Sequence, residues 1–375
     1  MSHARLICGR CGAYYPVGMA TLACADCNVP LDVDYTAGQG DGGTRAQWAG
    51  YSIPLPLHGG RSGNSLGEGD TPVVELPAVG RRLGLKRLHG KLEFMSPTGS
   101  FKDRGVAVMM AVALELGVAE VVEDSSGNAG ASVSAYAARA GIKAHVFAPA
   151  TAPEAKVGQI RVYGAEVHSI DGSRDDTTDA AVAFYKARGL VYASHAWSPY
   201  FLEGTKTFAY EVAAHFEGRV PDHIVFPVGN GGLYLGTWKG FRELRRAGHI
   251  SVVPRLHAVQ SRGVMPLVAG YNGEEWSKAA ATKTVAGGIA VAAPARIRQV
   301  LDALRDSEGV AVAVDDPEIL EMQRLLSARE GVFAEPTSAA AFAGLELLVA
   351  DGVIGEEDLT LVAITGFGLK DEIRL

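Results

Sequence analysis

Beyond about residue 90, short apolar runs rich in β-branched residues alternate with longer stretches in which apolar positions recur at helical spacing. Short runs of this kind are typical of buried strands, and the longer stretches of helices. The repeated order of strand, loop and helix indicates α/β units around parallel sheets. The elements predicted in this way are strand 118–122, helix 129–140, strand 145–148, strand 167–170, helix 175–188, strand 191–192, strand 224–227, helix 233–246 and strand 359–364.

The size and composition allow two domains of ordinary size and a small appendage. The chain has 375 residues, of which 47% are hydrophobic, and its 46 glycines indicate many tight loops near strand ends. Residues 38–50, rich in glycine and polar side chains, are predicted to be a linker or arm, and residues 58–71 a second loop.

The charge pattern argues against nucleic acid and membrane as partners. The net charge is -7, and no block of like charges occurs. Residues 1–10 lack the apolar run of a signal peptide, and Glu115 interrupts the nearest candidate for a membrane span. We therefore expect a soluble, cytoplasmic protein.

All four cysteines lie in the first 27 residues, as two C-x2-C pairs: Cys8 with Cys11, and Cys24 with Cys27. Two such pairs can place four thiolates tetrahedrally around one zinc ion, so a zinc ribbon is predicted over residues 1–35. With no open coordination position, this zinc would be structural. The alternatives are a metal-free ribbon and, less suited to a reducing compartment, disulfides. The ribbon carries few cations, which disfavours phosphate binding.

A lysine stands in a glycine-flanked turn, residues 96–105, directly before the apolar run 106–116. A lysine side chain can form a Schiff base with an aldehyde, and a constrained loop at a helix start is suited to hold it. The alternative is that Lys102 joins Asp103 and Arg104 in a solvated ion-pair cluster.

Three further loops follow predicted strands. Residues 125–128 read Ser-Ser-Gly-Asn, and residues 228–232 form a glycine-rich loop before a helix. Glycines let a backbone approach an anion, and a helix start offers unsatisfied N–H groups, so this second loop is a candidate phosphate cradle. The alternative is a glycine needed only for packing. Thr365 ends the last strand, where ligands gather in such sheets.

Six segments together make the chain resemble the fold-type-II pyridoxal-phosphate enzymes, and within them the threonine synthase branch. The segments, in the family's order, are P-T-G-S-F-K-D-R-G at 97–105, S-S-G-N at 125–128, E-G-x-K-T at 203–207, P-V-G-N-G-G at 227–232, E-P-x-S-A-A at 335–340 and T-G-x-G-L-K-D at 365–371.

The resemblance implies a role for each matching position. Lys102 would bind pyridoxal 5'-phosphate and move protons on the substrate, and Asn128 would hydrogen-bond the cofactor's ring oxygen. Thr365 would face the ring nitrogen with a neutral hydroxyl. Ser125 and Ser126 would bind the carboxylate of a small amino-acid substrate. The phosphate would be held by the backbone of Gly229, Asn230, Gly231, Gly232 and Leu233.

Several substrate positions depart from the family's pattern. Phe201 stands where an arginine usually helps to bind the phosphate of O-phosphohomoserine, and Ala129 stands where threonine is common. Leu233 and Phe367 replace an asparagine and a histidine. Arginine's bidentate grip on phosphate is not reproduced by phenylalanine, so we expect an altered substrate pocket. Other candidate anion anchors are Lys156, Arg161 and His195.

The resemblance implies an α/β fold of the tryptophan synthase β type with an N-terminal zinc ribbon. A large cofactor-binding domain would comprise 36–104 and 206–375, and a small α/β domain 105–205. The expected activity is that of a lyase acting by elimination or replacement, closest to threonine synthase. The alternatives are β-replacement on an activated serine, as in cysteate synthase, an ammonia-lyase on a hydroxy amino acid, and a non-catalytic relative. A homodimer is expected on family grounds.

Overall fold

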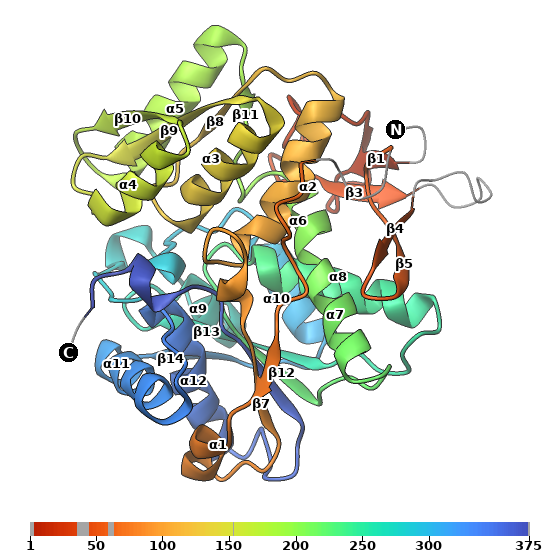
Figure 1. Ribbon diagram of the computed structural model, residues 1–375, viewed down its shortest axis with the longest axis vertical. Helices are drawn as coiled ribbons and strands as arrows, with labels where there is room; N and C mark the ends of the chain where they lie inside the picture. The colour runs from red at the N-terminus through yellow and green to blue at the C-terminus, as the bar shows by residue number, and fades with distance from the viewer. Residues whose placement is uncertain (1–3, 36–44, 59–63, 153, 374–375) are drawn as a thin grey trace. The chain divides into compact units, whose positions relative to one another are not determined.

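The computed structural model describes residues 4–35, 45–58, 64–152 and 154–373 (Figure 1). Its contacts divide the chain into two compact units, each assembled from separate stretches of sequence. The first unit is built from residues 1–68 and 102–207, and the second from 69–101 and 208–375. The domain boundaries expected from the sequence stay a prediction. The described residues between 45 and 68 group with the first unit.

The first unit contains a four-stranded parallel sheet of strand order β10-β9-β8-β11. Its strands and helices alternate as the sequence predicts. Their bounds are α2 (Lys102–Glu115), β8 (Glu120–Glu123), α3 (Asn128–Ala140), β9 (Lys143–Pro149), α4 (Glu154–Val162), β10 (Glu166–Ile170), α5 (Arg174–Arg188), β11 (Val191–Tyr192) and α6 (Pro199–Thr205).

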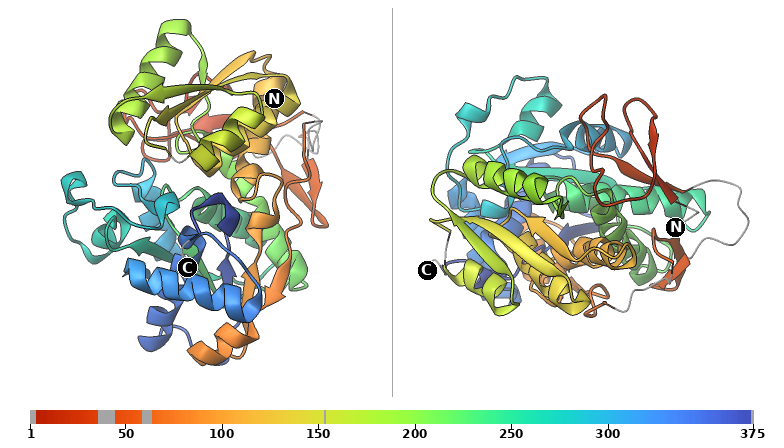
Figure 2. Two further views of the ribbon diagram at one scale, coloured as in Figure 1. Left: turned by 60° about the vertical axis from the view of Figure 1, so that its left-hand side comes forward. Right: turned by 90° about the horizontal axis from the view of Figure 1, so that it is seen from above.

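Side chains that alternate along β9 supply the two hydrophobic faces of this sheet. Val146 packs with Ala131 of α3 and Ile160 of α4. Its neighbour Phe147 points to the opposite face and packs with Ala181 of α5. Helices therefore cover both faces (Figure 1 and Figure 2, left).

The N-terminal residues form a small antiparallel sheet of order β2-β1-β3, drawn in red in Figure 2. Its strands are β1 (Ala4–Ile7), β2 (Tyr14–Tyr15) and β3 (Asp32–Tyr35), and a hairpin of β4 (Arg45–Trp48) and β5 (Tyr51–Pro54) follows. The predicted linker is therefore wrong for residues 45–50, while residues 38–44 lie outside the described residues. The turn uses positive φ at Ala49 and Gly50, the two-residue geometry that favours hairpins. Alanine rarely adopts this conformation, so the turn gave no sequence signal.

The second unit is built on a six-stranded sheet of order β14-β13-β12-β15-β7-β6, parallel except for the edge strand β6. Its elements are β6 (Val73–Glu75), α1 (Pro77–Leu83), β7 (Leu88–Lys91), α7 (Thr207–His215), which starts at the unit boundary, β12 (His223–Pro227), α8 (Gly232–Arg246), β13 (Arg255–Ser261), α9 (Pro266–Asn272), α10 (Ile297–Asp306), β14 (Ala311–Val314), α11 (Asp316–Leu325), α12 (Pro336–Ala350) and β15 (Thr360–Ala363), with short 3-10 turns η1 (Glu93–Met95), η2 (Lys278–Ala280), η3 (Gly287–Ile289) and η5 (Gly368–Lys370) and a π-helical turn η4 (Leu326–Glu330).

The core of the second unit centres on α12, whose residues are buried on nearly every side. Gly344 permits this burial: a Cβ there would lie 2.3 Å from Cγ2 of Val259 on β13. The helix is apolar all round because it is enclosed by the unit. No helix among the described residues is both long and apolar enough to cross a membrane.

Candidate functional site

Lys102 is the first residue of α2, so the helix begins within the predicted turn 96–105, whose last four residues are helical. Its neighbours Asp103 and Arg104 are buried. The Ser132 hydroxyl donates to Oδ1 of Asp103 over 2.6 Å, and Nη1 of Arg104 donates to the Thr207 hydroxyl over 2.9 Å. The interpretation as a solvated surface cluster is therefore wrong. Both charged neighbours instead hold the start of α2 in place within the first unit.

The turn before Lys102 is bonded to the end of β15 within the second unit. The N–H of Phe101 donates to the carbonyl of Thr365 over 3.0 Å, and the N–H of Phe367 donates to the carbonyl of Gly99 over 3.0 Å. Gly99 has a φ of 85°, a conformation that favours glycine. The residue preceding Lys102 is therefore anchored, which restricts the backbone from which the lysine projects.

Phe201 on α6 is completely buried in the first unit. A Cβ on Gly105 would lie 2.4 Å from Cδ2 of Phe201, so the ring rests on α2 where that helix lacks a side chain. Nζ of Lys102 lies 5.5 Å from the centroid of the Phe201 ring. An aromatic surface thus lies beside the lysine.

The Ser-Ser-Gly-Asn loop joins the carboxyl end of β8 to α3. Gly127 is the N-cap of α3 and provides no side-chain cap, while Ser125 and Ser126 precede it. At Gly130, a Cβ would lie 1.9 Å from the Ser125 carbonyl oxygen, so only glycine lets the helix approach the loop this closely. Asn128 is partly exposed and Ala129 is buried. Such a helix start favours an anion.

The glycine-rich loop lies in the second unit, at the start of α8. Gly231 is the N-cap, has a φ of 79°, and provides no side-chain cap. A Cβ there would lie 2.4 Å from Cγ2 of Val300, and one on Gly229 would lie 3.0 Å from the Gly288 carbonyl oxygen. Asn230 and Gly232 complete the turn, and Leu233 is buried in the first turn of the helix. The backbone therefore has both the shape and the dipole direction for a phosphate.

Thr365 is buried at the end of β15 in the same unit. Its hydroxyl lies 3.0 Å from that of Ser338 on α12, and the Ser338 oxygen also accepts from the N–H of Gly366 over 2.9 Å. The threonine hydroxyl is thus oriented by a second buried hydroxyl. This partner was not foreseen, since Ser338 is only one of many small residues in α12.

Sequence reasoning also missed a buried acid–base pair in the first unit. Glu123, the last residue of β8, is completely buried, and Oε1 lies 3.0 Å from Nδ1 of His195. Next to it, Asp124 accepts from Arg174 over 2.9 Å and from Thr178 over 2.7 Å. The sequence does hold a signal for this pair: two adjacent acidic residues, Glu123 and Asp124, stand between the apolar run 118–122 and the Ser-Ser-Gly-Asn loop.

The candidate anion anchors have other surroundings. His195 faces the Glu123 carboxyl, and Arg161 pairs with Glu154 on the surface over 2.7 Å. Lys156 is partly buried in α4. Burial lowers the pKa of His195 well below its usual range, which makes this imidazole a poor anchor for an anion.

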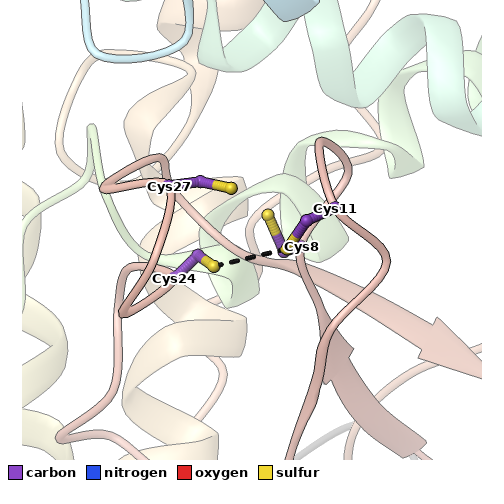
Figure 3. A group of neighbouring side chains, drawn as sticks. All are labelled: Cys8, Cys11, Cys24 and Cys27. Carbon is purple, nitrogen blue, oxygen red and sulfur yellow. Dashed lines mark hydrogen bonds between the residues drawn. The ribbon is translucent and has the colours of Figure 1, made fainter.

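The four cysteines come together as their spacing predicts (Figure 3). The four sulfur atoms all lie within 4.8 Å of one another, and Sγ of Cys11 is 3.6 Å from Sγ of Cys24. The two turns are alike: the N–H of Gly12 donates to the Cys8 carbonyl, and that of Asn28 to the Cys24 carbonyl. The Tyr15 hydroxyl donates to the Cys24 sulfur over 3.2 Å and lowers the pKa of that thiol to about 6. Four thiols so arranged can hold a metal ion.

A second group of possible metal ligands consists of His145, Glu166 and His168 on β9 and β10. These side chains already bond within the protein. Nδ1 of His145 lies 3.1 Å from Nε2 of His168, and Glu166 pairs with Lys143 over 2.9 Å. Their mutual hydrogen bonds account for the arrangement.

Known proteins resemble this chain over most of its length. The family described as "Pyridoxal-phosphate dependent enzyme" matches residues 64–366. The threonine synthase of Methanocaldococcus jannaschii is 36% identical over 375 residues, covering 97% of this chain and 92% of the relative. That of Methanosarcina acetivorans is 38% identical over 380 residues, covering 98% and 92%.

Solved structures with similar folds include a pyridoxal 5'-phosphate-dependent aspartate racemase, with a TM-score of 0.68, 25% identity, and coverage of 79% of this chain and 90% of that one. A T.th. threonine deaminase has a TM-score of 0.68 and 26% identity, covering 81% and 94%.

Proposed function

The chain belongs to the family of pyridoxal-phosphate dependent enzymes and is a lyase related to the threonine synthases, and from this premise we propose that it removes a leaving group from a small amino acid and adds a nucleophile. The observation that carries the proposal is the position of Lys102. It begins α2 directly after a turn that is bonded to the end of β15. A constrained turn at the start of a helix is suited to hold a reactive amine.

The residues present fit pyridoxal phosphate. The uncapped start of α8, where Gly229 and Gly231 leave no room for a Cβ, would hold the phosphate with Asn230, Gly232 and Leu233. Asn128 would face the ring oxygen, and Thr365, oriented by Ser338, the ring nitrogen. When bound, the cofactor supplies an electron-withdrawing ring that stabilises negative charge on the substrate's α-carbon.

Lys102 would be the attachment point and would take and return the proton of the α-carbon. To attack an aldehyde the amine must be neutral. The ring of Phe201 lies beside it, with the ring centroid 5.5 Å from Nζ of Lys102. Thr365 presents a neutral hydroxyl rather than a carboxylate, which leaves the ring nitrogen largely unprotonated. Elimination and replacement are favoured over transamination for this reason.

The substrate carboxylate would bind at Ser125 and Ser126, beside the uncapped start of α3. The residues of the site define the leaving group of the substrate less closely. The reaction closest to the relatives' printed activity is the conversion of O-phosphohomoserine to threonine. Phe201, which is buried where an arginine is common, supports an altered pocket, as does the small, buried Ala129.

A panel of amino acids tests this proposal. The purified holoenzyme is incubated with O-phosphohomoserine, O-phosphoserine, O-acetylserine, serine and threonine, and phosphate, acetate, ammonia and the amino-acid products are measured. Turnover of at least one of them, lost in Lys102→Ala, is expected. Failure to consume any of the five would overturn the proposal.

Phe201 also favours a second candidate function, elimination or replacement at the β-carbon of a serine derivative. Without a guanidinium, no positive charge from that position meets a phosphate dianion. A cysteate synthase-like replacement would consume O-phosphoserine or O-acetylserine with a sulfur nucleophile. An ammonia-lyase would release ammonia from serine or threonine. In the same panel, consumption of O-phosphohomoserine alone excludes both.

We propose that Cys8, Cys11, Cys24 and Cys27 hold one structural Zn²⁺. The 3.6 Å separation of the Cys11 and Cys24 sulfurs fits the edge of a tetrahedron with Zn–S bonds of about 2.3 Å. One zinc per chain, measured on purified protein, is expected. Homodimerisation, proposed on the family resemblance, is tested by analytical ultracentrifugation.

A further inference from the structure

We propose that Glu123 and His195 form a proton-donating pair in the substrate site, and that Glu123 gives its proton to a leaving hydroxyl. The proposal rests on the proposed function and names its substrate class: an amino acid whose leaving group is an uncharged hydroxyl on the β-carbon. Glu123 would be a proton donor that touches the substrate. His195 would act through Glu123, as a positioning residue.

The topology brings the pair to the carboxyl edge of the small parallel sheet. β8 and β11 are parallel neighbours in which Val121 pairs with Val191 and Val122 with Tyr192. Glu123 is the next residue of β8, and the N–H of Ala193 donates to the Val122 carbonyl over 2.8 Å. His195 follows two residues later. Ligands bind at this edge of α/β sheets, and the serine loop leaves the same strand end.

The two oxygens of the Glu123 carboxyl differ in their surroundings. Oε1 lies 3.0 Å from Nδ1 of His195, whereas Oε2 is buried without a hydrogen-bond partner among the described residues. Leaving a buried polar atom unpaired is costly because the atom loses its hydrogen bonds to water, so native proteins rarely do so without a reason. A ligand hydroxyl is the partner that this atom lacks.

The surroundings hold both members of the pair in their neutral forms. Burial raises the pKa of Glu123 well above its usual range and Asp124 raises it further, against the opposing charges of Arg174 and Lys102. Burial lowers the pKa of His195 well below its usual range, and the charge of Lys102 lowers it further. Asp124 cannot take over as the donor: burial opposes its ionisation, but Arg174 and Thr178 bring its pKa below the usual range. Burial also raises the pKa of Tyr192, so this phenol stays neutral.

A second Glu–His pair contains the other glutamate of β8, and its surroundings shift the pKa of that glutamate in the opposite direction. At the amino end of β8, Oε2 of Glu120 lies 2.8 Å from Nε2 of His145. Glu120 is 36% exposed, and the hydrogen bond from His145 lowers its pKa. The pKa of the glutamate is therefore lowered at the solvated end of β8 and raised at the enclosed end.

The proposed step moves two protons, one to Lys102 and one from Glu123. Lys102 takes the proton of the α-carbon, and the electron pair left behind forms the new double bond as the C–O bond breaks. The electrons of the C–O bond stay on the oxygen, which takes the proton from Oε2 of Glu123 and leaves as water. The resulting carboxylate is stabilised by Nδ1–H of His195 and by the nearby charges of Lys102 and Arg174.

The chemistry of the leaving group decides whether such a donor is needed. Hydroxide is a poor leaving group because water has a pKa of about 15.7. A phosphate group, with a second pKa of about 6, leaves without a proton. General acid catalysis contributes typically about 10²–10⁴-fold. The pair therefore indicates a hydroxy amino acid as the substrate. It would accelerate the departure of a phosphate group very little.

Leaving-group dependence in holoenzyme variants tests the step. Glu123→Gln keeps the shape of the side chain but has no acidic proton, and Glu120→Gln makes the same change in the other pair of β8. We expect Glu123→Gln to lower kcat for serine or threonine by at least about 10²-fold. We expect it to change kcat for O-acetylserine or O-phosphoserine by only a few-fold. Glu120→Gln should resemble the wild type with every substrate.

Infrared difference spectroscopy on cofactor-free protein gives a readout that does not depend on turnover. A carboxylic-acid C=O band should be present at neutral pH, vanish in Glu123→Gln and persist in Glu120→Gln. Absence of that band from the wild type overturns the proposal, as does an equal loss of rate with all leaving groups. Wild-type enzyme that consumes only phosphorylated substrates also overturns it. Consumption of none of the panel instead overturns the proposed function itself.

Discussion

The ring of Phe201 occupies the space that a side chain at position 105 would need. A Cβ on Gly105 would lie within 2.4 to 2.6 Å of three ring carbons of Phe201. The pairing sets one face of α6 on α2 and places the ring beside Lys102. It explains why the helix that begins at Lys102 carries a glycine one turn from its start.

We expect Gly105→Ala to destabilise the protein although alanine is the better helix former. Overpacking typically costs about 1–3 kcal/mol, which exceeds the gain of up to about 1 kcal/mol from helix propensity. Urea denaturation measures the change. Gly158→Ala in α4 is the matched control, because a Cβ at Gly158 meets nothing within 4 Å, and it should be neutral or stabilising. Phe201→Leu should relieve part of the cost of Gly105→Ala in the double variant. An unperturbed Gly105→Ala would contradict this packing.

Lys102→Ala should abolish the visible absorption of the cofactor attached to the protein while leaving the fold intact. Asp103 and Arg104 keep their buried partners in this variant, so α2 should still form. Lys143→Ala, a change at an exposed lysine of the same unit, should leave the absorption unaltered. An unchanged spectrum in Lys102→Ala would show that the cofactor is attached elsewhere.

Tyr15→Phe should weaken zinc binding without removing a ligand. The Tyr15 hydroxyl donates to the Cys24 sulfur and favours its thiolate form. Loss of such an outer partner commonly reduces metal affinity by about 10–100-fold. Competition with a chromophoric chelator measures this affinity. Tyr14→Phe, at an exposed neighbour on the same strand, serves as the control. Equal affinity in Tyr15→Phe and wild type would indicate that the hydroxyl serves the turn alone, through its bond from the Ala25 N–H.

Glu123→Gln should stabilise the protein at neutral and alkaline pH. The unfolded chain loses the Glu123 proton near its ordinary pKa of 4.5, whereas the folded protein keeps it to higher pH. The folded state then binds more protons than the unfolded state. Stability therefore falls as pH rises, by up to about 1.4 kcal/mol per pH unit while the two states differ by one proton. The glutamine variant should lose this slope in urea denaturation between pH 5 and 8.

Glu120→Gln is the control for that experiment, because the pKa of Glu120 is shifted in the opposite direction. The pKa of Glu120 is lowered by His145, so its contribution is present above the ordinary pKa and is lost as pH falls. Removing Glu120 should therefore cause no gain at neutral pH. Parallel pH profiles for wild type and Glu123→Gln would mean that Glu123 ionises at its ordinary pKa.

The elements that were predicted lie close to the observed ones because they rest on local patterns, whereas β7, β13, β14 and α9 to α12 received no prediction. The predicted helix 233–246 is observed as Gly232–Arg246, and the predicted strand 224–227 as His223–Pro227. These elements are indicated by apolar runs and glycine-rich loops, whose residues are adjacent in the sequence. The hairpin at Arg45–Pro54 was missed because its turn depends on a backbone conformation at Ala49 that alanine seldom adopts.

The sequence by itself also determined the family and the clustering of the four cysteines, and it singled out Lys102 as the candidate reactive lysine, since each is carried by short, contiguous motifs. Tertiary structure decided what no motif carries. Glu123 and His195 are 72 positions apart in the chain, and only the parallel pairing of β8 with β11 brings them to one edge. Whether a carboxyl group is ionised depends on the water and charges around it. Sequence shows two acids on β8, and burial makes one of them a proton donor.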